Sequence, residues 1–166
     1  MKAKLIIKGQ EFDIEVPDNL QELISSKRTG YERVETGDKF WCADIGNDIH
    51  SATDNKMFIE NKAYKTANYY SSCKIAENNV RADNLMRKLR RFAVEHRENE
   101  FDWTYQVQRK YYIYYGNRTN ELLIGESGTA RDFGVIYFDS EKTAKLAIET
   151  FKDELIWYFT EYKDSL

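Results

Sequence analysis

The last third of the chain contains the pattern that most constrains the fold. Residues 110–115 and 121–124 are rich in Tyr, Ile and Leu and flank a Gly-Asn turn, and aromatic and β-branched residues favour strands. A third run of this kind covers residues 134–138. Ser140 then stands at the expected N-cap of a helix whose apolar residues recur at helical spacing up to Phe151. The segment therefore predicts strand, turn, strand, strand and helix.

The same order is predicted earlier in the chain, and it sets the fold class. Residues 40–45 and 49–53 flank Gly-Asn-Asp and predict a hairpin. We expect at least one further strand within residues 57–70, and a long amphipathic helix from near Ala76. We therefore predict an α+β fold, with antiparallel strands on one side and helices on the other. A duplicated strand–strand–strand–helix unit and an arrangement of two small lobes both fit this order.

A hairpin is also predicted at the start of the chain. Residues 4–8 and 12–16 flank Gly-Gln, and a helical turn is expected over residues 19–25. The length of 166 residues and the lack of a Gly-rich or Pro-rich linker indicate one domain, 1–166. Its parts are the N-terminal hairpin and connection (1–36), the first strand and helix unit (37–100) and the second unit (101–166).

The long helix predicts a basic surface. Its apolar residues recur at the spacing of one helical face: Ala82, Leu85, Met86, Leu89, Phe92 and Ala93. Four basic residues lie off this stripe: Arg87, Lys88, Arg90 and Arg91. If the stripe packs inward, these side chains face solvent and can contact nucleic-acid phosphates. The simpler interpretation is a solvated helix face.

The acidic side chains are concentrated earlier in the sequence. Residues 11–60 hold 12 acidic and 5 basic side chains, whereas residues 61–118 hold 12 basic and 6 acidic ones. An acidic surface can meet a positively charged partner. The candidate contacts are Glu32, Glu35, Asp38, Asp44 and Asp48. Here too the simpler interpretation is that the charges solvate the fold.

The sequence offers no recognisable catalytic or metal-binding pattern. Cys42, His50, Cys73 and His96 are separated by 7, 22 and 22 residues, unlike the short paired spacings of structural zinc sites. Ser127 lies in Gly-Glu-Ser-Gly, which lacks the second spacer of a nucleophile elbow. We therefore expect a protein that is not an enzyme and needs no metal or other cofactor.

A cytoplasmic location is expected. The sequence has no apolar run near the roughly 20 residues that span a bilayer, so no membrane association is predicted. The start, Met-Lys-Ala-Lys-Leu-Ile-Ile-Lys, lacks the apolar region of a signal peptide. Two cysteines fit reduced thiols better than a disulfide framework.

Five segments carry a resemblance to known proteins: Phe40-Trp-Cys42, Leu89-Arg-Arg-Phe-Ala93, Phe101-Asp-Trp103, Lys110-Tyr-Tyr-Ile113 and the stretch from Val135 to Ala144. Together they resemble small uncharacterised proteins of phages and other mobile elements of Gram-positive bacteria, over roughly residues 37–160. Where that family has Lys-Thr-Glu-Glu-Ala, this chain has Lys-Ile-Ala-Glu-Asn-Asn at residues 74–79. The resemblance implies a role in the conflict between phage and host.

Three functions follow as hypotheses. The first is a non-catalytic inhibitor that binds a bacterial defence protein, with a CRISPR nuclease as the leading candidate (an anti-CRISPR), through the acidic residues. The second is a nucleic-acid-binding accessory protein that uses the basic helix. The third is a sponge that holds a nucleotide messenger between aromatic and basic side chains.

Overall fold

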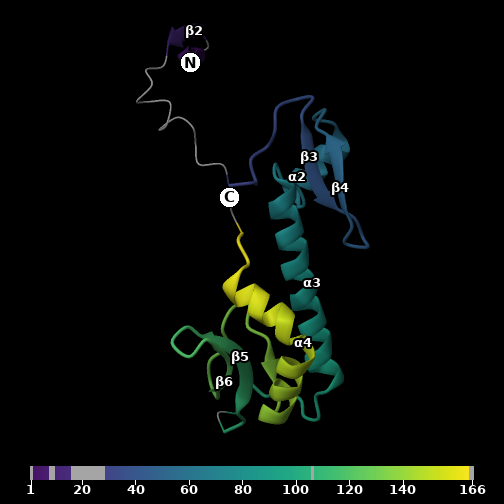
Figure 1. Ribbon diagram of the computed structural model, residues 1–166, viewed down its shortest axis with the longest axis vertical. Coiled ribbons are helices and arrows are strands. Elements are labelled where there is room, and N and C mark those ends of the chain that lie inside the picture. Colours follow the sequence, from purple (N-terminus) through teal and green to yellow (C-terminus); the bar gives the residue numbers. More distant parts are fainter. Residues whose placement is uncertain (1, 8–9, 16–28, 106, 165–166) are drawn as a thin grey trace.

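The protein has an α+β fold, as predicted. A computed structural model (Figure 1) describes residues 2–7, 10–15, 29–105 and 107–164. The strands are β1 (Lys2–Ile7), β2 (Gln10–Glu15), β3 (Lys39–Ala43), β4 (Ile49–Thr53), β5 (Lys110–Gly116), β6 (Glu121–Ser127) and β7 (Tyr137–Phe138). The helices are α2 (Phe58–Lys65), α3 (Cys73–Glu95) and α4 (Glu141–Thr160).

All strand pairings among the described residues are antiparallel. β1 pairs with β2, with Leu5 opposite Phe12, which confirms the N-terminal hairpin. β3 pairs with β4, and β5 lies between β6 and β7. The helical turn expected over residues 19–25 lies outside the described residues.

The long helix α3 buries the predicted apolar stripe. Ser72 is its N-cap, and the hydroxyl accepts a hydrogen bond from the Ile75 amide, so the helix begins at Cys73, before the predicted start near Ala76. The stripe residues are buried except Met86, which is partly exposed. None of the described helices is both long enough and apolar enough to cross a membrane.

The prediction of a strand within residues 57–70 is wrong. Residues 58–65 form α2 instead, because Asn61, Lys62 and Ala63 suit a strand poorly and this segment has no alternation of apolar and polar residues. After the helix, Tyr70 makes a single antiparallel bridge with Trp41 of β3.

The two predicted units share one order of pairing. In the first, β3 pairs with β4 on one side and with Tyr70 on the other; in the second, β5 pairs with β6 and β7 in the same way. Each unit continues two residues later into a helix that is capped by a serine, Ser72 or Ser140. The first unit differs by the insertion of α2 between its hairpin and the bridge.

The helix α3 connects the two units (Figure 1). Its N-terminal end packs beside the β3–β4 hairpin, and its C-terminal half shares a core with α4 and the three-stranded sheet. The members of that core include Leu85, Leu89, Phe92, Phe138, Ala144, Ala147 and Leu155. Helix α4 covers one face of the sheet and has a non-helical backbone at Phe151 (φ −116°, ψ 21°). The loops at the ends of this packed unit carry the candidate site.

Candidate nucleic-acid interface

The acidic candidates lie in two groups at the opposite ends of β3. Glu32, Glu35 and Asp38 precede the strand, and Asp44 and Asp48 form the turn that follows it. A strand of this length, 5 residues, spans about 17 Å. The five carboxylates are therefore spread along the hairpin.

Two of these carboxylates bind groups of their own chain. Glu32 accepts hydrogen bonds from the amides of Thr29 and Gly30 and from the Ser71 hydroxyl, the last at 3.0 Å. The bonds from Thr29 lower the Glu32 pKa to about 2. Asp44 accepts from the Asp48 amide at 2.9 Å and lies 3.1 Å from His50 Nε2. Glu32 and Asp44 thus stabilise the loops in which they lie.

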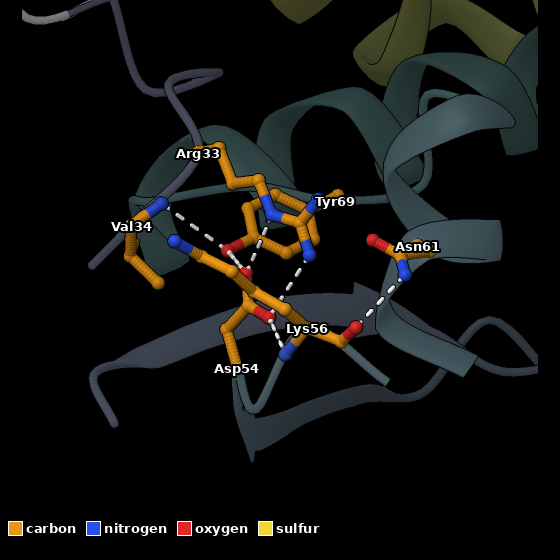
Figure 2. A network of polar contacts seen from close by, with 6 residues as sticks. All are labelled: Arg33, Val34, Asp54, Lys56, Asn61 and Tyr69. Atoms are coloured by element: carbon orange, nitrogen blue, oxygen red, sulfur yellow. Dashed lines mark hydrogen bonds and ion pairs between the residues drawn. The ribbon is translucent and has the colours of Figure 1, made fainter. Parts of the chain in front are cut away.

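A buried ion pair holds the base of the same hairpin (Figure 2). The Asp54 carboxylate is fully buried and accepts from Arg33 Nε at 2.8 Å, Arg33 Nη2 at 3.1 Å, the Tyr69 hydroxyl at 2.8 Å and the Lys56 amide at 2.7 Å. The Arg33 hydrogen bond keeps the Asp54 pKa well below its usual range. Since both carboxylate oxygens are satisfied by protein donors, this network supports the fold and is not a ligand site.

The four basic candidate residues on α3, Arg87, Lys88, Arg90 and Arg91, are exposed, as the helical spacing predicts. Arg87, Arg90 and Arg91 follow one another at intervals of 3 and 1 residues along one face, and Lys88 projects to its side. Arg87 Nη2 donates to Asn47 Oδ1 in the β3–β4 turn at 2.5 Å. Arg91 Nε lies 3.8 Å from a Glu95 carboxylate oxygen. Arg90 lines a groove at the C-terminal end of the helix.

This groove, called here the arginine groove, has a volume of about 360 Å³. It lies between the end of α3, the loop that follows it and the segment before β7. Its charged and aromatic lining consists of Arg90, Arg97, Phe101, Trp103, Arg131 and Tyr137. Sequence reasoning identified only Arg90 as a candidate contact, because the other residues are spread over loops without a periodic pattern.

Aromatic rings support the cations of the groove. The Arg97 guanidinium lies 5.3 Å from the Phe101 ring centroid, and that of Arg131 lies 5.4 Å from the Trp103 centroid. Trp103 also meets the Tyr137 ring edge to face at 5.1 Å. Cation–π contacts use the face of a guanidinium and leave its N–H donors free for an anion.

Carboxylates neutralise the groove only in part. Arg97 Nη2 lies 3.0 Å from a Glu100 oxygen. Within the described part of the chain, neither Arg90 nor Arg131 has an ion pair or a side-chain hydrogen bond. The groove therefore presents two guanidinium groups, those of Arg90 and Arg131, that no carboxylate of the described residues neutralises.

A buried lysine joins the two loops that form the groove. Lys110 is fully buried, and its ammonium donates to the carbonyl oxygens of Asp102 at 2.7 Å and Gly128 at 3.4 Å. The same ammonium lies 5.0 Å from the Trp103 ring centroid. It thus adds a positive charge beneath the groove and fixes the positions of the loops that carry Trp103 and Arg131.

Comparison with known proteins yields no relative: no family model, curated protein or solved structure matches the chain. Among the residues that the structure describes, no cluster of His, Cys, Asp and Glu side chains could hold a metal ion.

Proposed function

We propose that this protein binds single-stranded nucleic acid, with the phosphates held in the arginine groove and along the exposed arginines of α3. The observation that carries this proposal is the pair Arg90 and Arg131, two unpaired guanidinium groups that line one groove beside aromatic rings. Proteins that bind single strands combine a positive groove with aromatic side chains in this way.

The chemistry favours phosphate contacts at the centre of the site. A guanidinium offers planar, paired N–H donors that match two phosphate oxygens. The faces of Phe101 and Trp103 are already in contact with cations, so these rings act first by positioning the arginines. A nucleic-acid strand that continued from the groove along α3 would next contact Arg87 and Arg91.

Charge reversal at the groove is the direct test. The double variant Arg90→Glu/Arg131→Glu should weaken binding of a fluorescent oligo(dT) or oligo(rU) by at least about 100-fold at low salt, because two phosphate contacts become repulsive. Anisotropy titrations over a range of salt concentrations should also give a log–log slope shallower by about 1.4, the value for two contacts to a single strand.

The control variant is Lys74→Glu/Lys142→Glu. It makes the same change in net charge at two exposed positions in the first turns of α3 and α4, where acidic residues are favourable to the helix. Its affinity should fall much less than that of the groove variant. If both variants lost the same affinity for the oligonucleotide, the effect would come from net charge and not from the groove. If the unmodified protein did not bind the oligonucleotide, the proposal would be wrong.

Binding of a nucleotide messenger would use the same groove, and a competition experiment separates the two ligands. A strand contacts several arginines at once, so single nucleotides should displace the fluorescent oligonucleotide only at far higher concentration. Displacement by a cyclic mono- or dinucleotide at a concentration close to that of the oligonucleotide would instead assign a messenger-binding function.

Inhibition of a bacterial defence nuclease stays a prediction. The hydrogen bonds of the five acidic candidates show which of these side chains can be replaced without disturbing the fold. Among the five acidic candidates, Glu35, Asp38 and Asp48 have exposed side chains that accept no hydrogen bond from the described residues. Alanine at these three positions should abolish inhibition of a CRISPR nuclease in a DNA-cleavage assay while the stability changes little. Inhibition that survives the triple replacement would rule out phosphate mimicry by this region.

A further inference from the structure

A second hollow lies on the other side of the loop that carries Arg131. It has a volume of about 310 Å³ and is called here the apolar pocket. Its walls come from α3, β5, α4 and the loop before β7, and they include Met86, Leu89, Ile113, Val135, Leu155 and Tyr158. Both Met86 and Tyr158 are partly exposed, so the pocket opens to the surface of the packed unit.

The lining of the apolar pocket selects a hydrocarbon. Apart from the Tyr158 hydroxyl and the weakly polar Met86 sulfur, every side chain that lines it is hydrocarbon or glycine. A nucleobase would leave its polar edge without partners in these surroundings, which is costly. An alkyl chain loses nothing there and gains from the removal of its surface from water.

A hollow lined by two arginines adjoins the apolar pocket. It is lined by Arg90, Arg131, Asp132 and the segment 133–135, and that segment also lines the apolar pocket. The Asp132 carboxylate accepts a hydrogen bond from the Tyr137 hydroxyl at 3.1 Å, whereas the two arginines are without an ion pair in the described part of the chain. An apolar cavity and two unpaired guanidinium groups therefore meet at one short segment.

From this juxtaposition we infer that the protein binds a fatty acid, with its alkyl chain in the apolar pocket and its carboxylate on Arg90 and Arg131. The Phe133 side chain is fully exposed beside the pocket, where it can cover the bound chain. The inference does not depend on the proposed function. It does share two arginines with that function, so a bound fatty acid competes with nucleic acid for them.

The decisive variant fills the pocket without touching the arginines. Met86→Trp places a large ring in the apolar pocket and should weaken binding of dodecanoate, measured by calorimetry below its micelle concentration, by at least about tenfold. Binding of oligo(dT) by this variant should be unchanged. Met57→Trp is the matched control, because Met57 is an exposed methionine outside the pocket. Ile113→Trp, at a partly exposed position that lines the apolar pocket but not the arginine groove, provides a repeat of the test if Met86→Trp does not fold.

The head group is tested with a neutral ligand. Dodecanol should bind at least about tenfold more weakly than dodecanoate, since it lacks the charge that the two arginines recognise. Equal affinity for the two ligands, no saturable binding of dodecanoate, or equal binding by both tryptophan variants would overturn the inference. Flotation with phosphatidylglycerol vesicles in the absence of dodecanoate binding would likewise overturn the assignment to a free fatty acid.

Discussion

Replacement of Asp54 by alanine is expected to lower the free energy of unfolding by about 3 kcal/mol, within the range for breaking a buried ion pair. Asp54 is fully buried, and its two oxygens accept four hydrogen bonds, from Arg33, Tyr69 and the Lys56 amide. Alanine leaves the Arg33 charge and the Tyr69 hydroxyl without their acceptor. The unpaired donors, more than the lost attraction, account for the large cost.

The measurement is urea unfolding followed by circular dichroism. Asp38→Ala is the matched control, because Asp38 is an exposed carboxylate near the same hairpin whose side chain accepts no hydrogen bond from the described residues. Its free energy of unfolding should change by less than about 0.5 kcal/mol. Similar losses for the two variants would mean that the network contributes nothing specific to stability.

The same network predicts how stability depends on pH. The Asp54 pKa is lower in the folded protein than in the unfolded chain, so its contribution is present above the unfolded value of about 4 and is lost as the pH falls below it. Burial raises the pKa of Tyr69 to about 12. The contribution of Tyr69 to the free energy of unfolding is therefore complete below about pH 10 and is lost as the pH rises above that value. In an Asp54→Asn variant the decline toward acid should be smaller.

Much of the fold follows from local patterns, and the exceptions have physical causes. The α3 stripe from Ala82 to Ala93 repeats over several turns, so its helix and its buried face were both predictable. Segment 58–65 has no such repeat, and none of its residues is buried. Since α2 has only 8 residues and buries none of them, its sequence pattern is too short to distinguish a helix from a strand.

The arginine groove could not be predicted in the same way. Arg97 and Trp103 come from the loop after α3, Arg131 comes from the distant loop before β7, and the pairing of β7 with β5 brings the two loops together. The burial of Lys110 could not be predicted either, since a lysine at the start of a strand is usually solvated. Its burial depends on two backbone carbonyls that only the folded loops supply.

This dependence of the site on β7 leads to the second large effect, which is expected for Phe138→Ala. Phe138 is 1% exposed and lies in the core between α3 and α4, so the variant should lose about 3–5 kcal/mol of the free energy of unfolding through lost burial and a residual cavity. A loss of this size is a large share of the stability of a typical domain. Since Phe138 pairs with Tyr111 and is next to Tyr137, the groove should loosen as well.

Phe133→Ala provides the comparison, because it removes the same side chain five residues earlier at a fully exposed position. Its free energy of unfolding should stay within about 0.5 kcal/mol of the unmodified value. Urea unfolding measures both variants, and anisotropy at a temperature where Phe138→Ala is still folded measures its affinity for oligo(dT). If the Phe138 variant were as stable as the Phe133 variant, β7 would not be part of the cooperative core. If it were less stable but bound oligo(dT) with unchanged affinity, the groove would hold its shape independently of β7 packing.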